Sequence, residues 1–239
     1  MKNNLSALDP RLISIRDLTE EDIPFILNYW FHSPPGFIEA MGVDTAKLPS
    51  EADMAKSLEE KCRINRTLPA SKTNALVVSY ANQPIGLHTL FPFTQGDSGI
   101  FHAHLWKSEM RGRGLALHSY PRACQIFIQR FDLKRILFKT PIQNKGAIRV
   151  KEKLGIRSIG EETIGFGIIR DGTRAKVFEL SKEESFFLCD RLNADGVDHS
   201  QIQRNLALTP EERILEHQNS LDLAFKLRNA GVDPNEEPQ

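Results

Sequence analysis

Short runs of alternating apolar and polar residues recur along the first three quarters of the chain. In the run 101–106, for example, Phe101, Ala103 and Leu105 stand at every second position. Because successive side chains of a strand point to opposite faces, such runs predict half-buried strands. Alternation predicts strands at residues 13–18 and 101–106, and residues 75–80 are a strand rich in β-branched residues. The other predicted strands comprise residues 85–91, 135–140, 158–170 and 176–180. Two pairs of them flank short turns, at 81–84 and 171–172, and therefore predict hairpins.

Apolar residues at helical spacing lie between the strands and after the last one. The predicted helices comprise residues 23–30, 51–65, 113–131, 181–188 and 209–231. Thr19 with Asp22, and Ser50 with Asp53, are capping signals before the first two helices. Thr209 followed by a proline marks the start of the last one.

The order of these elements predicts the fold class. Three consecutive antiparallel strands lead into a glycine-containing turn and a helix, and a parallel strand and another helix follow. This order predicts a mixed α/β (α+β) domain with a mostly antiparallel sheet, flanking helices, and a ligand at the C-terminal end of a strand. The predicted organisation is a flexible N-terminus (1–11), this domain (12–191), a connector (192–208), a C-terminal amphipathic helix (209–231) and a disordered tail (232–239).

The turn between residues 107 and 114 has the features of an anion site. Gly112 and Gly114 lack a Cβ, so the backbone can approach a ligand closely, and the first N–H groups of the following helix are free. Arg111 and Arg113 add fixed positive charge, which suits a polyanion such as a pyrophosphate. We therefore expect this turn to bind a cofactor phosphate.

Composition narrows the classes of partner. Thirty-one basic and thirty-one acidic residues cancel, so we expect neither nucleic-acid nor membrane binding. Cys62, Cys124 and Cys189 are odd in number and far apart, which favours reduced thiols and a cytoplasmic protein. The first residues contain no apolar segment typical of a signal peptide, and no apolar run reaches the length of a membrane span.

Two motifs together resemble those of the GCN5-related N-acetyltransferase (GNAT) superfamily. The pattern R-x-x-G-x-A at Arg111, Gly114 and Ala116 is similar to the family's acyl-CoA loop, and residues 144–156 resemble its second cofactor element, which begins N-x-x-A. The resemblance covers roughly residues 12–181 and implies the GNAT fold and acetyl-CoA as cosubstrate. The cofactor-binding residues that it implies are Leu105, Trp106, Arg111, Gly112, Arg113, Gly114, Leu115, Ala116, Asn144, Ala147 and Lys151.

His102 and His104 are the predicted catalytic bases. They project from the same face of one strand next to the glycine turn, and an ordinary imidazole pKa near 6.5 suits a base at neutral pH. A histidine pair is similarly placed in the arylalkylamine branch of the family. Glu109 is a third catalytic candidate. The histidines could instead be structural, as we expect for His88, and no third ligand nearby supports a metal site.

One position departs from the family pattern. Many relatives carry a tyrosine seven residues after the motif asparagine to protonate the leaving thiolate, and Lys151 stands there in this chain. A lysine or water could supply that proton, or none is needed. We therefore expect an N-acetyltransferase acting on a primary amine by direct attack, with a non-catalytic acyl-CoA-binding module as the alternative.

The acceptor is left open by the motifs. A small amine, an aminoglycoside-like compound, a polyamine or a protein N-terminus would all fit, and a homodimer is compatible with the sequence. Residues 32–50 combine prolines and glycines with apolar side chains. In the family this region forms one wall of the acceptor site, so we expect acceptor choice to depend on it.

Overall fold

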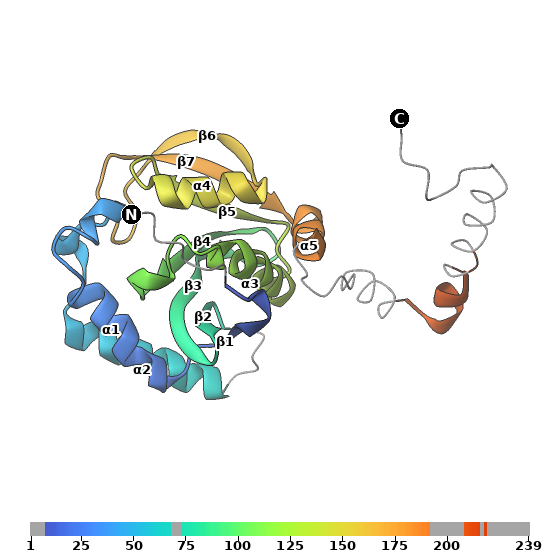
Figure 1. Ribbon diagram of the computed structural model, residues 1–239, viewed down its shortest axis with the longest axis horizontal. Helices are drawn as coiled ribbons and strands as arrows, with labels where there is room; N and C mark the ends of the chain where they lie inside the picture. The colour runs from blue at the N-terminus through green and yellow to red at the C-terminus, as the bar shows by residue number, and fades with distance from the viewer. Residues whose placement is uncertain (1–7, 68–72, 192–207, 216–217, 219–239) are drawn as a thin grey trace. The chain divides into compact units, whose positions relative to one another are not determined.

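The computed structural model describes residues 8–67, 73–191, 208–215 and 218. Seven strands form one sheet in the order β1-β2-β3-β4-β5-β7-β6 (Figure 1). Their bounds are β1 (Ile13–Asp17), β2 (Ala75–Tyr80), β3 (Gln83–Thr94), β4 (Ser98–Leu105), β5 (Arg135–Pro141), β6 (Arg157–Ile164) and β7 (Thr173–Ser181). Neighbouring strands are antiparallel except β4 and β5, which are parallel. The predicted mostly antiparallel mixed sheet is confirmed.

Helices cover both faces of this sheet. The helices are α1 (Ile23–Phe31), α2 (Glu51–Thr67), α3 (Leu115–Phe131), α4 (Lys145–Leu154) and α5 (Lys182–Arg191). Val77 of β2 packs with Ile26 of α1 and Cys62 of α2, whereas the adjacent Leu76 packs in the cluster that contains Phe127 of α3. Because adjacent residues of β2 point to opposite faces, α1 and α2 lie on one side of the sheet and α3 on the other.

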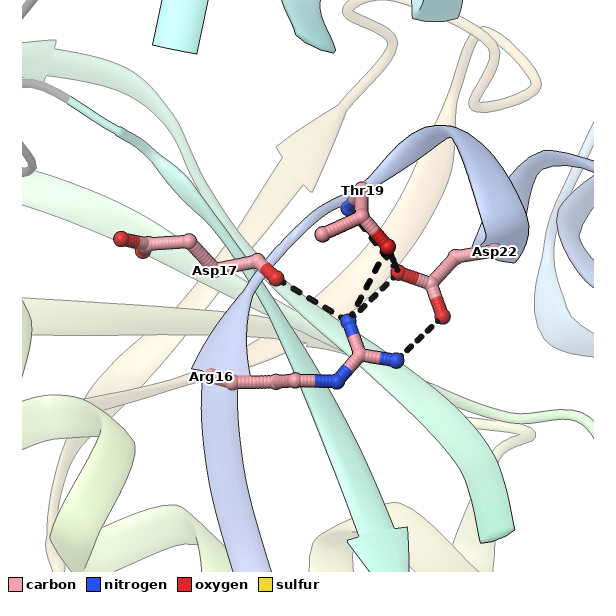
Figure 2. A network of polar contacts seen from close by, with 4 residues as sticks. All are labelled: Arg16, Asp17, Thr19 and Asp22. Carbon is pink, nitrogen blue, oxygen red and sulfur yellow. Dashed lines mark hydrogen bonds and ion pairs between the residues drawn. The ribbon is translucent and has the colours of Figure 1, made fainter. Parts of the chain in front are cut away.

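The start of α1 depends on a buried carboxylate. As predicted, Asp22 reaches back to Thr19 and accepts a hydrogen bond of 2.9 Å from its backbone N–H. Arg16 donates two further hydrogen bonds of 2.7 Å to the two carboxylate oxygens (Figure 2). Burial alone would raise the pKa of Asp22, but the hydrogen bonds from Arg16 and Thr19 outweigh it and lower the pKa. The charged carboxylate thus joins the end of β1 to α1.

Several predicted boundaries are wrong, and three of them bear on the site. α3 begins at Leu115 instead of residue 113, because Gly114 has a left-handed φ of +86°. β4 begins at Ser98, so Gly99 lies inside the strand, where a Cβ would stand 2.7 Å from Leu90 Cδ1. β6 ends at Ile164 and does not reach residue 170.

The N-terminal prediction also needs correction for its last residues. Leu8 is buried with Ile13 and Val78, and Pro10–Leu12 form a 3₁₀ turn capped by Asp9. Residues 1–7 lie outside the described residues.

The irregular segment 32–50 packs against the loop that follows β6. Val43 forms an isolated bridge with Ile169, and Lys47 Nζ donates a hydrogen bond of 3.1 Å to the carbonyl of Ile169. Tyr29, at the end of α1, is buried in the same cluster as Val43. This contact brings two segments more than a hundred residues apart together beside β4.

Residues 195–239 form a separate unit. Within it, residues 210–215 are helical, and the predicted start is confirmed by a hydrogen bond of 2.7 Å from the Thr209 N–H to Glu212. Most of the predicted helix, the connector and the tail lie outside the described residues.

Candidate active site

The parallel strands β4 and β5 separate toward their C-terminal ends. Their paired residues run only from Ser98 to Ile100 of β4. Beyond this point the Trp106 N–H donates a hydrogen bond of 2.9 Å to Ile85 of β3. Because backbone direction alternates along a strand, the N–H groups of Ala103 and Leu105 then point away from β3, toward β5. The sheet therefore contains a gap with free backbone groups along one side.

Two cavities meet at this gap. One, of about 450 Å³, lies against the glycine turn and the starts of α3 and α4, and we call it the cofactor cavity. The other, of about 350 Å³, lies against the histidines of β4 and the loop after β6, and we call it the acceptor cavity. Ala103, Tyr120, Asn144 and Ala147 line both. Two ligands could therefore contact each other between β4 and β5.

The cofactor cavity fits a polyanion attached to a long arm. Gly112 and Gly114 both have left-handed φ values, with no atom within 4 Å of where a Cβ would stand. Gly114 caps α3 without a side chain, so no side chain covers the first N–H groups of the helix. Arg111, Arg149 and Lys153 line the same cavity. Helix N–H groups, open space and three cations together suit phosphate groups.

His104 is enclosed by aromatic side chains. Its ring contacts Tyr29 and Trp30, and its Nδ1 lies 3.2 Å from the Tyr29 hydroxyl. The hydroxyl also donates to Met41 Sδ at 3.3 Å, and in that arrangement its oxygen accepts the Nδ1 proton of His104 and leaves Nε2 with a free lone pair. Burial lowers the pKa of His104 to about 3, so the imidazole is neutral at neutral pH.

His102 has a defined tautomer. Its Nε2 lies 2.6 Å from the carbonyl oxygen of Phe91, which can only accept, so Nε2 carries the proton and Nδ1 is the acceptor. Burial lowers its pKa as well. Both histidines line the acceptor cavity, as predicted, but neither has the ordinary pKa near 6.5 that we expected.

Lys151 lies in the wall of the acceptor cavity instead of the cofactor cavity. Its side chain is buried, with Nζ 5.4 Å from the ring centre of Tyr120 and 5.7 Å from that of Phe138. Burial lowers its pKa to about 8. Asn144 lies seven residues before Lys151 and caps α4 by accepting a hydrogen bond of 3.1 Å from the Ala147 N–H. The predicted capping role of Asn144 is thus seen, and its side chain stands where the two cavities meet.

Several predicted residues lie elsewhere. Trp106 lines neither cavity and stacks on Phe25 of α1 at 5.8 Å. Glu109 is exposed on a 3₁₀ turn and lines neither cavity, so the structure does not place it beside the histidines. Arg113 does not line the cofactor cavity; its Nη1 lies 3.8 Å from Met110 Sδ.

Arg111 does line the cofactor cavity, but its guanidinium is already engaged. It lies 4.2 Å from the ring centre of Phe37 and donates a hydrogen bond of 2.9 Å to the carbonyl of Leu105. His88 is fully buried, with Nε2 3.0 Å from the Ser119 hydroxyl, and burial lowers its pKa to about 3. It is structural, as expected.

The sequence did not indicate several residues that line the cavities, among them the polar or charged residues Tyr29, Lys139, Arg149 and Lys153. Arg149 and Lys153 are one turn apart on α4, and this spacing after Asn144 could have indicated them. Tyr29 and Lys139 had no such signal, because their neighbours in the site come from distant parts of the chain. In the part of the chain that the structure describes, no cluster of three or more His, Cys, Asp or Glu could hold a metal.

Comparison with known proteins decides the family. Residues 12–157 match the model of the acetyltransferase (GNAT) domain. The chain belongs to the GNAT family. The predicted resemblance and fold class are thereby confirmed, and the chain is an N-acetyltransferase by family. No curated protein matches it.

Solved GNAT structures have the same fold at low identity. Spermidine N-acetyltransferase from Vibrio cholerae, solved with CoA and spermine, is 19% identical over 73% of this chain and 98% of its own, with a TM-score of 0.58. Ribosomal-protein-S5-alanine acetyltransferase from Vibrio fischeri is 15% identical over 72% and 94%, with a TM-score of 0.55. A ribosomal L7/L12 α-N-protein acetyltransferase in complex with CoA is 12% identical over 72% and 96%, with a TM-score of 0.58. Such similarity describes the GNAT fold and leaves the acceptor open.

No helix among the described residues of this GNAT protein combines the length and apolar character that crossing a membrane requires.

Proposed function

We propose that this protein transfers the acetyl group of acetyl-CoA to a primary amine by direct attack in a ternary complex. The observation that carries the proposal is the meeting of two cavities at the β4–β5 gap. Holding two reactants in contact can lower the activation barrier by roughly 7–11 kcal/mol. The relatives solved with CoA support the choice of cosubstrate.

The cofactor cavity would hold acetyl-CoA by its phosphates. The N–H groups at the start of α3, with Arg149 and Lys153, face the space where a pyrophosphate fits. Ala103 and Leu105 direct backbone N–H groups into the gap, where they can donate to the arm and to the thioester oxygen. Acetyl-CoA supplies an activated acetyl group; the chain's residues position it and exclude water.

The histidine pair would accept the proton that the amine loses. As the new C–N bond forms, the amine becomes acidic, and the neutral imidazole of His104 or His102 takes one proton while the C–S bond breaks. The pKa of His104, about 3, keeps its ring unprotonated at pH 6–9 and ready to accept, and burial also lowers the pKa of His102. Lys151 or water then returns a proton to the thiolate. We also expect a cytoplasmic protein, because all three cysteines are free and buried.

Calorimetric titration of acetyl-CoA tests the assignment of the cofactor cavity. In Gly114→Glu, a carboxylate occupies the space for the phosphates. We expect the affinity for acetyl-CoA to fall about 10-fold or more through the loss of charged hydrogen bonds. Gly96→Glu is the matched control. Gly96 also has a left-handed φ and open space around its Cβ position, but it lies at the opposite end of β4.

Tight binding by the parent and by Gly96→Glu, lost in Gly114→Glu, supports the proposal. Equal affinity in all three proteins would overturn the assignment of the glycine turn. Binding without acetyl transfer to any amine would favour a non-catalytic acyl-CoA-binding module.

A further inference from the structure

The acceptor cavity carries positive charge and no negative charge of its own. Four basic side chains line it, His102, His104, Lys139 and Lys151. None of the described residues in its wall is Asp or Glu. An acceptor in this cavity therefore meets no carboxylate among the described residues of the wall.

The two lysines differ in their partners. Lys139 forms an ion pair of 2.6 Å with Glu162, so its charge is neutralised at the wall. Lys151 is only 6% exposed, and its Nζ has no hydrogen bond or ion pair to any described residue; the neighbours of Nζ are the rings of Tyr120 and Phe138. A buried ammonium without an anion is unfavourable. A ligand that brings one negative charge would correct this.

The same environment disfavours additional cations. The pKa values of His102, His104 and Lys151 are all lowered, mainly by burial, and no carboxylate is among the charges that act on them. The second and third ammonium groups of a polyamine would meet the same penalty. The attacking amine itself does not meet this penalty, because it must lose its proton, and hence its charge, before it reacts.

The rest of the wall is mainly apolar. Trp30, Val43, Phe91, Phe166 and Ile168 surround the space of about 350 Å³. Its size and lining suit a compact apolar side chain next to the amine.

We propose that the preferred acceptor is an apolar primary amine that carries one carboxylate, as a hydrophobic amino acid does, and that Lys151 binds this carboxylate. The inference rests on the proposed acetyl transfer. It assigns to the chain a class of acceptor different from that of the polyamine acetyltransferase with the same fold.

Matched pairs of acceptors test this inference. Phenylalanine and phenethylamine differ by the carboxylate alone, and spermidine represents the polyamines. With acetyl-CoA saturating, kcat/KM is measured for each and corrected for the unprotonated fraction of each amine. We expect phenylalanine to exceed phenethylamine by about 10-fold or more, as one charge-assisted hydrogen bond allows, with spermidine the poorest.

Variants separate carboxylate binding from a role of Lys151 in the reaction itself. In Lys151→Met the ratio of phenylalanine to phenethylamine should fall to near one. The double variant Lys139→Met/Glu162→Gln removes the neutral ion pair without changing the net charge, and should keep the ratio of the parent. If Lys151→Met slows both acceptors equally, the lysine serves only the thiolate and the inference is overturned.

Different experimental outcomes would overturn this inference and the proposed function. Spermidine or phenethylamine as the best acceptor overturns the carboxylate inference and leaves acetyl transfer intact. Absence of transfer to every amine, with acetyl-CoA bound, overturns both.

Discussion

The ionisation of the site histidines is governed by what surrounds them. The ring of His104 lies among Tyr29, Trp30 and the walls of a cavity, and its pKa of about 3 is far below that of an imidazole in water. A base with such a low pKa is a weak acceptor for a free ammonium, but it can accept a proton from an amine that is already forming a bond. The imidazole would thus act late, after attack has begun.

A double variant tests the base. His102→Ala/His104→Ala should lower kcat about 100-fold, the lower end of what general bases contribute. Because the pKa of His104 is about 3, its titration should cause no inflection of the parent's kcat/KM near pH 6.5, and kcat/KM should rise with the unprotonated fraction of the acceptor. Initial rates across pH 6–9 provide both readouts.

His32→Ala is the control for that experiment. His32 is exposed, pairs with Glu51 and lines neither cavity. Full activity of the double variant over the whole pH range would show that water, and not the histidine pair, removes the proton.

At this scale the sequence predicted which residues gather but not where their side chains point. His102 and His104 were found because a strand's alternation fixes their common face. The predicted positions of Trp106 and Glu109 in the site are wrong because the strand ends at Leu105 and residues 108–110 form a 3₁₀ turn outside both cavities. Tyr29 lies 75 residues before its partner His104, and no local pattern encodes such a contact.

Among the elements, α1 depends most on a single polar group. Asp22 accepts four hydrogen bonds, two from Arg16 and two from Thr19, in one network at the sheet edge (Figure 2). α1 in turn places Tyr29 and Trp30 beside His104. A substitution that breaks this network should therefore lower the stability of the fold. It should affect the active site only indirectly, through the position of α1.

Asp22→Asn should lower the free energy of unfolding by about 1–3 kcal/mol, since it removes charged hydrogen bonds. The folded pKa of Asp22 is lowered, so its contribution is present above the unfolded pKa of about 3.9 and disappears as pH falls through the folded value. Urea unfolding of both proteins at pH 7 and pH 3 measures this difference.

Asp53→Asn provides the comparison, because Asp53 forms the analogous cap with Ser50 at the exposed start of α2. We expect a loss of less than about 1 kcal/mol there. Equal losses in the two variants would contradict the importance of the Arg16 contacts.

Element types were predictable and their ends were not. Alternation, β-branched residues and turn signals together identified all seven strands, and caps located the helix starts at Thr19 and Ser50. The ends of β6 and the start of α3 depend on the loop contacts of Ile169 and on the left-handed φ of Gly114. These are tertiary and conformational facts that periodicity does not contain.

The whole molecule carries a pH dependence of stability through buried neutral histidines. His88 is fully buried and its folded pKa is about 3, below the unfolded value near 6.5. The folded state therefore excludes a proton that the unfolded state binds. The resulting stability is complete above pH 6.5 and is lost as pH falls toward 3.

His88→Gln should reduce this slope by about 1.4 kcal/mol per pH unit below pH 6, the effect of one proton. Thermal or urea unfolding of parent and variant at pH 8, 6 and 5 gives the slope of the unfolding free energy against pH for each protein. The comparison of slopes does not depend on how stable the variant is at pH 8. Parallel pH dependences would show that His88 is protonated in the folded protein.

The separation of β4 from β5 also links the cosubstrate to folding. Ala103 and Leu105 present backbone groups that the sheet leaves without a neighbouring strand. An extended ligand with its own amides can lie there, and only the folded chain offers it this place. Its binding free energy is then added to the free energy of unfolding. The enzyme would be most resistant to unfolding while its cosubstrate is bound, and least resistant between turnovers.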